Sequence, residues 1–169
     1  MTPPVRAAVG AGAILLVVYV ATLAPGVTLW DAGELIAAVH GLGVPHPPGT
    51  PLFVLVGRAW TLALGFLPTA LAANLMSAVA TAVACALGGA LVARWSGSAW
   101  MGAASGVCAG LMSSVWRNAT ETEVYALALL LAAVTLVAAE GAGRAGGTRR
   151  LALVAYLLAL AVPLHVLAL

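Results

Sequence analysis

Residues 30–51 read WDAGELIAAVHGLGVPHPPGTP, and this stretch decides how the rest of the chain must be arranged. It holds two of the five acidic residues, two of the three histidines and four of the nine prolines. The sequence on both sides of it is almost entirely apolar. Because lipid cannot solvate charged side chains, such a polar and proline-stiffened segment must lie at a water interface or line a cavity. We therefore expect it to be the active-site loop of a membrane enzyme.

The composition is that of an integral membrane protein. Of the 169 residues, 63% are hydrophobic and only 7% are charged, and the mean hydropathy is +1.11. Soluble globular domains carry about 25% charged residues, so the first expected partner is the lipid bilayer. The net charge of +2 comes from seven arginines and no lysine, without the basic cluster that a nucleic-acid partner requires.

Five apolar segments are predicted to cross the bilayer, whose hydrocarbon core is about 30 Å thick. They are residues 7–24, 69–93, 98–116, 123–140 and 151–169. We predict an all-α integral membrane protein, a multi-pass helical bundle with an outer loop, residues 25–67, that carries juxtamembrane helices. Gly102, Gly106 and Gly110 recur at four-residue spacing, which predicts the close approach of a neighbouring helix.

The arginines orient the predicted spans by the positive-inside rule. Arg6 precedes the first span, and the basic loop 141–150 precedes the last one. We therefore expect the N-terminus and this loop on the cytoplasmic side of a bacterial-type plasma membrane. In that orientation the stretch 30–51 and a second polar island, residues 116–125, both lie on the outer face.

An even number of crossings must separate two islands that share a face. Three apolar segments lie between the islands, so one of them does not span. The weakest is 52–67, which is short and contains Arg58. We expect it to form a juxtamembrane or re-entrant helix. The chain stops at Leu169 inside an apolar run, and we expect it to be the N-terminal part of a longer protein.

Within the opening stretch, Leu29 to Leu42 is predicted to form an amphipathic helix with Thr28 as its N-cap. Asp31 and Glu34 are three residues apart, so they lie on one face of that helix. A carboxylate pair at the membrane surface can supply a general base. Alternatively, Thr28 and Asp31 resemble a capping box, in which the acid only stabilises the helix start. The spacing leaves both interpretations open.

The histidines have separate interpretations. His46 lies between Pro45 and Pro47, whose stiff backbone would hold it as a ligand of a phosphate or hydroxyl group; the alternative is a surface histidine. His165 follows Pro163 in the last apolar segment, where it either bonds backbone freed by the proline or faces a cavity. The histidines lack metal-ligand spacing, so we predict no metal site and no cofactor, and dependence on a divalent metal stays open.

The second polar island brings three charges to the start of a span: Arg117, Glu121 and Glu123. These charges either bind substrate beside the opening stretch, or balance one another and stabilise the helix start. The sequence contains no Walker motif, CxxC or GxSxG that would point to another class of enzyme.

Four motifs occur in an order that is typical of one family. They are DAGEL at 31–35, VPHPPGTPLF at 44–53, Asn74-Leu75 at the start of a span, and WRNATETEVYAL at 116–127. Together they resemble the membrane O-mannosyltransferase-like family whose animal member glycosylates plexin-type receptor domains. That family belongs to the GT-C superfamily of polyprenyl-phosphate-sugar glycosyltransferases. The resemblance covers essentially the whole chain.

The resemblance implies a GT-C fold whose first outer loop carries a catalytic acid. By position, Asp31 would deprotonate the acceptor hydroxyl, and Glu34 would assist or bind sugar. His46 would approach the phosphate of the donor. The predicted substrate-binding positions are His46, Arg117, Glu121, Glu123 and His165. Family members are much longer, so we expect parts of the acceptor site to lie outside these residues.

The predicted reaction is the transfer of a sugar, mannose by resemblance, from a polyprenyl phosphate to a hydroxyl acceptor on a protein Ser/Thr or a glycan. A rival interpretation is a transporter or channel subunit, in which the same acids would face a pathway that opens alternately to both sides. A third is a non-catalytic membrane scaffold. A GT-C site would open only to the outer face and sideways to lipid.

Overall fold

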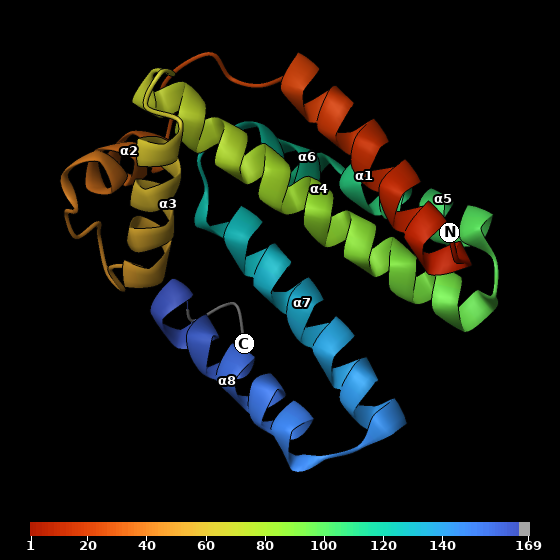
Figure 1. Ribbon diagram of the computed structural model, residues 1–169. Coiled ribbons are helices and arrows are strands. Elements are labelled where there is room, and N and C mark those ends of the chain that lie inside the picture. Colours follow the sequence, from red (N-terminus) through yellow and green to blue (C-terminus); the bar gives the residue numbers. More distant parts are fainter. Residues whose placement is uncertain (166–169) are drawn as a thin grey trace.

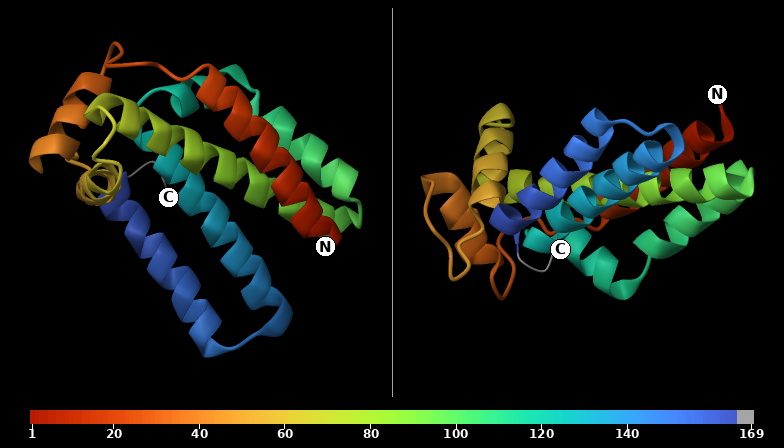
Figure 2. Two further views of the ribbon diagram at one scale, coloured as in Figure 1. Left: turned by 45° about the horizontal axis from the view of Figure 1, so that its top comes forward. Right: turned by 90° about the horizontal axis from the view of Figure 1, so that it is seen from below.

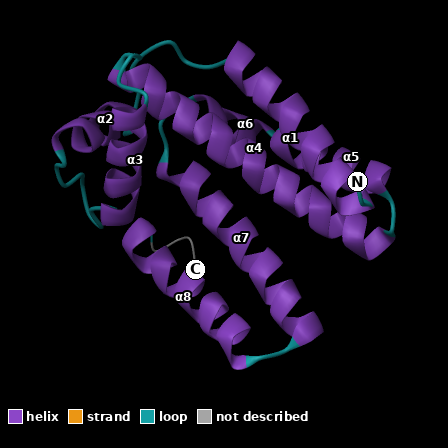
Figure 3. Ribbon diagram, in the orientation of Figure 1, coloured by secondary structure: helices purple, strands orange, loops and turns teal. Residues whose placement is uncertain are grey.

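The computed structural model describes residues 1–165 (Figure 1). This part of the chain forms helices joined by loops and contains no strand, which confirms the all-α prediction (Figure 3). In chain order the helices are α1 (Pro3–Ala21), α2 (Ala32–Gly41), α3 (Pro51–Ala63), α4 (Thr69–Ser96), α5 (Ala99–Gly110), α6 (Ser113–Thr120), α7 (Val124–Ala145) and α8 (Thr148–Leu164).

Helix α4 is the centre of the bundle. It packs against α1 and α5 on one side and against α7 on the other, while α8 lies along α7 (Figures 1 and 2). Its side chains are small and mostly buried, with Ala72, Ala73, Ala78 and Ala93 fully inaccessible. Small residues let helices approach closely where lipid removes the hydrophobic driving force for association.

Three helices of the described chain are long and apolar enough to cross a membrane: α1, α4 and α7. They overlap the predicted spans 7–24, 69–93 and 123–140, whose crossing of the bilayer stays a prediction. Helix α3 has 13 residues, which at 1.5 Å per residue span about 20 Å, less than the bilayer core. It runs crosswise to α4 beside the start of that helix (Figure 2). Its expected juxtamembrane or re-entrant placement stays a prediction, as does the crossing of 151–169.

The apolar segment 98–116 is not one continuous helix, and its predicted crossing of the membrane stays a prediction. Helix α5 ends at Gly110, and α6 starts again at Ser113 after Met112 adopts an extended conformation. A continuous helix would use the Gly110 carbonyl to accept from the backbone N–H four residues later. Here the hydroxyl of Tyr19 on α1 donates to that carbonyl at 2.8 Å. This long-range bond offers an alternative to the helical one, and the chain turns there.

The glycine pattern on α5 has the role that the sequence predicts. Gly102, Gly106 and Gly110 are all buried in the contact with α1 and α4. A Cβ on Gly106 would lie 2.8 Å from the Cys85 carbonyl oxygen and 3.0 Å from the Ala11 Cβ. Both distances are shorter than van der Waals contact, so only glycine permits this approach.

The far end of the bundle is closed by ion pairs. Arg94, near the end of α4, donates to Glu140 on α7 at 2.7 Å, and Arg144 donates to the same carboxylate. This end contains the C-termini of α4 and α7 and the N-terminus of α8. The polar loops that contain residues 30–51 and 121–123 lie at the opposite end.

Candidate active site

Helix α2 presents the first two acidic residues. It begins at Ala32, and Trp30 has a φ of 64°, so the prediction of a helix from Leu29 with Thr28 as N-cap is wrong. A left-handed Trp30 interrupts the helical path before Asp31. Asp31 occupies the N-cap position but makes no capping hydrogen bond. The capping-box interpretation therefore fails, while Glu34 still lies in the first turn, where the helix dipole favours a negative charge.

His46 binds Glu34 and approaches Asp31. Both oxygens of the Glu34 carboxylate accept from His46, one from its backbone N–H at 2.6 Å and one from Nδ1 at 2.8 Å. Because a carboxylate only accepts, Nδ1 carries the proton in this contact. The other ring nitrogen, Nε2, lies 3.9 Å from Asp31 Oδ2, beyond hydrogen-bond distance. The imidazole therefore lies between the two carboxylates and is hydrogen-bonded to Glu34 only.

The contact shifts the ionisation of both partners. The hydrogen bond with Glu34 raises the pKa of His46, and the bonds donated by the His46 side chain and backbone lower the pKa of Glu34. The contribution of His46 to stability is complete below its ordinary value of 6.5 and is lost as pH rises through the raised pKa. That of Glu34 is complete above 4.5 and is lost as pH falls through the lowered pKa. The ion pair of Glu34 and His46 therefore contributes most to stability at pH values between the lowered pKa of Glu34 and the raised pKa of His46.

Glu123 enters the same site from the second island. It precedes α7, and its backbone N–H donates to Ser77 on α4 at 3.4 Å. Burial raises the pKa of the Glu123 carboxyl, and the negative charges of Glu121 and Asp31 raise it further. A carboxyl with a raised pKa holds its proton to higher pH, so it can donate a hydrogen bond as well as accept one.

These side chains line one small cavity of about 60 Å³. Asp31 and His46 come from the opening stretch, Glu123 and Tyr125 from the start of α7, and His165 from the end of α8. The rings of Tyr125 and His165 meet edge to face with centroids 5.5 Å apart. The two polar islands therefore share one end of the bundle, which is the geometry that the crossing count requires; which membrane face this end occupies stays a prediction.

The remaining predicted site residues lie beside this cavity rather than in its lining. Arg117 Nε, at the end of α6, is 3.4 Å from Glu121 Oε1. Arg117 is exposed, and its positive charge opposes the rise in the pKa of Glu123, while the Glu121 charge adds to that rise. The pair acts on the cavity through the charge state of Glu123. Binding of substrate by Arg117, Glu121 or His165 stays a prediction.

Asn74 belongs to one of the four family motifs, but its structural role in this site was not predicted from the sequence. Its side chain on α4 is fully buried, and Nδ2 donates to the carbonyls of Ala24 and Gly26 at 2.8 and 2.9 Å. Its Oδ1 accepts from the Thr122 hydroxyl at 2.6 Å. One amide thereby joins the loop before α2 to the loop that carries Glu123. An amide inside an otherwise apolar helix was the available signal.

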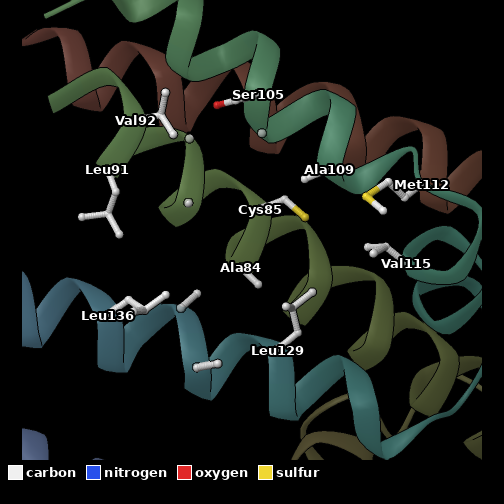
Figure 4. A pocket seen from close by; sticks show the side chains of 15 residues that line it. Ala84, Cys85, Leu91, Val92, Ser105, Ala109, Met112, Val115, Leu129 and Leu136 are labelled. Atoms are coloured by element: carbon white, nitrogen blue, oxygen red, sulfur yellow. The ribbon is translucent and has the colours of Figure 1, made fainter. Parts of the chain in front are cut away.

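A larger cavity of about 400 Å³ lies between α4, α5 and α7 (Figure 4). Aliphatic side chains such as Leu129 and Leu136 dominate its wall, with the Cys85 thiol and the Ser105 hydroxyl as isolated exceptions. No carboxylate or imidazole reaches it. Of these two cavities, only the small one is lined by carboxylate and imidazole groups. Within residues 1–165, no group of three His, Cys, Asp or Glu side chains is placed to hold a metal ion.

Fold and site together define a helical membrane protein with a carboxylate–imidazole cluster at one end of its bundle. The family model described as Protein O-mannosyl-transferase TMEM260 N-terminal domain matches residues 31–169. The chain belongs to this family. The match begins at the first acidic residue of the cluster and includes both polar islands.

Two curated relatives have the corresponding name. The chain is 34% identical over 122 residues to the mouse Protein O-mannosyl-transferase TMEM260, a match that covers 72% of the chain and 17% of the relative. It is 30% identical over 113 residues to the Dictyostelium discoideum Protein O-mannosyl-transferase tmem260, covering 66% of the chain and 14% of the relative. The chain thus spans less than a fifth of the length of either relative. No solved structure shows significant similarity to it.

Proposed function

We propose that this chain supplies the catalytic base and the donor site of a GT-C-type protein O-mannosyltransferase. The donor would be a polyprenyl-phosphate mannose, the acceptor a protein Ser/Thr hydroxyl, and the site would face the outer side of the membrane. One observation carries the proposal: Asp31, His46 and Glu123, from both polar islands, line a single cavity. The names of the two relatives support the reaction class.

Asp31 is the base in this proposal because its environment differs from that of Glu34. Both Glu34 oxygens are occupied by hydrogen bonds from His46. Asp31 lines the cavity, is more than half exposed, and lies 3.9 Å from the nearest imidazole nitrogen. A general base needs a lone pair within reach of the proton that it removes. Glu34 instead holds and orients His46.

The reaction would proceed as a single displacement with inversion. The acceptor hydroxyl oxygen forms a bond to the anomeric carbon while its proton moves to the Asp31 carboxylate. The bond between that carbon and the phosphate oxygen breaks, and the polyprenyl phosphate leaves with the electron pair. His46 is cationic when both of its ring nitrogens carry protons, a state that Glu34 favours by raising its pKa. That charge stabilises the leaving phosphate.

Replacing Asp31 with Asn in the intact protein tests the proposal. With mannosyl polyprenyl phosphate as donor and a protein acceptor, we expect transfer to fall by roughly 10²–10⁴-fold, the usual contribution of a general base. Glu140→Gln is the matched control, because it removes a carboxylate at the opposite end of the bundle. Undiminished transfer by the folded Asp31→Asn protein would exclude Asp31 as the base.

A further inference from the structure

Thr50 has a buried hydroxyl without a hydrogen-bond partner in the described part of the chain. Its side chain is 95% buried, with 5% of its surface exposed, and it lines the cavity that contains Asp31, His46 and Glu123. A buried hydroxyl left unpaired costs about 1–3 kcal/mol, a cost that a ligand bound in this cavity would remove.

The local backbone explains why this hydroxyl makes no bond to residues 1–165. Thr50 precedes α3 at its N-cap, where threonine ordinarily accepts from a backbone N–H of the first turn. That bond requires an extended N-cap residue, but Thr50 has φ 36° and ψ 54° and makes no cap. The left-handed region is unfavourable for a β-branched residue. Thr50 therefore makes no capping hydrogen bond and has an unfavourable backbone conformation, while its side chain lines the cavity.

We infer that the Thr50 hydroxyl binds a hydroxyl group of the sugar that the cavity receives. This inference rests on the proposed function and adds to it the part of the donor that Thr50 contacts. Asp31 lines the same cavity, and an ionised carboxylate only accepts hydrogen bonds. A hydroxyl group of the ligand can bond to both residues, because it donates to the carboxylate and accepts from the Thr50 hydroxyl. A phosphate oxygen of the donor has no proton to donate, so it cannot bond to the Asp31 carboxylate and the Thr50 hydroxyl at once.

The assignment predicts opposite effects on stability and binding. Thr50→Val keeps the shape of the side chain and removes a hydroxyl that has no hydrogen-bond partner among residues 1–165. We therefore expect the melting temperature of the unliganded protein to stay unchanged or rise. Binding of a mannosyl polyprenyl phosphate should weaken roughly 10-fold, which corresponds to about 1.4 kcal/mol. Thr50→Ser retains the hydroxyl and should retain most of the affinity.

The experiment measures the dissociation constants of two lipids for the intact protein in lipid nanodiscs. One is mannosyl polyprenyl phosphate, and the other is the same polyprenyl phosphate without sugar. Thr50→Val should weaken only the first. Thr81→Val is the matched control, because Thr81 is also buried with an unpaired hydroxyl but does not line this cavity. It should change neither constant.

Each other outcome overturns a defined part of the inference. Equal weakening of both lipids by Thr50→Val would assign the hydroxyl to the phosphate. No weakening of either would remove it from the donor site, and a marked drop in melting temperature would show that it serves the fold. If the wild-type protein binds neither lipid, the proposed donor itself is wrong, and the assignment of Thr50 to its sugar falls with it.

Discussion

Asn74 makes a strong stability prediction, because a single amide holds both polar loops to α4. Asn74→Ala removes two hydrogen bonds to loop carbonyls and one from a threonine hydroxyl. Thr122 is fully buried, so its hydroxyl would be left unpaired. The carbonyls belong to Ala24 and Gly26, which are partly accessible, so water can replace the amide there.

These environments set the expected cost. An unpaired hydroxyl in a fully buried position costs about 1–3 kcal/mol, and each hydrogen bond exchanged for water costs about 1 kcal/mol. The sum is about 3–5 kcal/mol in the free energy of unfolding. Asn74→Asp should be no milder, because a carboxylate keeps the bond from Thr122 but cannot donate to the two carbonyls.

Denaturant titration in detergent micelles measures this free energy, and hydrogen exchange locates the damage. We expect faster exchange at residues 22–28 and 120–124, the two segments that the amide joins. Asn118→Ala is the matched control, since Asn118 is the other asparagine of the chain and its side chain makes no hydrogen bond within residues 1–165. A cost below about 1 kcal/mol for Asn74→Ala, or an equal cost for the control, would refute the argument.

Two further predictions concern the site and the bundle. Glu34→Gln should return the pKa of His46 toward 6.5, because the carboxylate that favours the imidazolium is removed; an NMR titration of the ring protons would contradict the assignment if the midpoint stayed raised. Gly106→Ala should destabilise the bundle by about 1–3 kcal/mol, because its Cβ would lie 2.8 Å from a backbone oxygen. Gly88→Ala meets nothing within 4 Å and should be neutral or slightly stabilising in thermal unfolding; equal losses would contradict the packing argument.

Much of the fold follows from local patterns. Hydropathy and length place the helices, and the four-residue glycine spacing predicts the close contact of α5. The patterns fail where a distant group intervenes. The break after Gly110 depends on a hydroxyl from Tyr19, 91 positions earlier in the chain. A left-handed Trp30 moved the start of α2 by three residues from the predicted Leu29 to Ala32.

The candidate site was likewise predicted in part from the sequence and completed by the tertiary structure. The motif order pointed to Asp31, Glu34, His46 and Glu123, and geometry brings Asp31, His46 and Glu123 to one cavity with Glu34 bonded to His46. Three residues apart on one face, the two acids of α2 look equivalent in sequence. Their difference arises because His46, 12 positions beyond Glu34, occupies that carboxylate and leaves Asp31 open to the cavity.

The sequence by itself determined that this protein lies in a membrane, where its helices run, and which polar segments must escape lipid. Those properties depend on the local composition and on the spacing of apolar residues, both of which can be read from the sequence. Only the tertiary structure decided that the two polar islands meet through Asn74, that Glu34 orients His46, and that the Thr50 hydroxyl lacks a partner within residues 1–165. Hydrogen bonds are short and directional, so their partners are fixed only when segments far apart in sequence pack together.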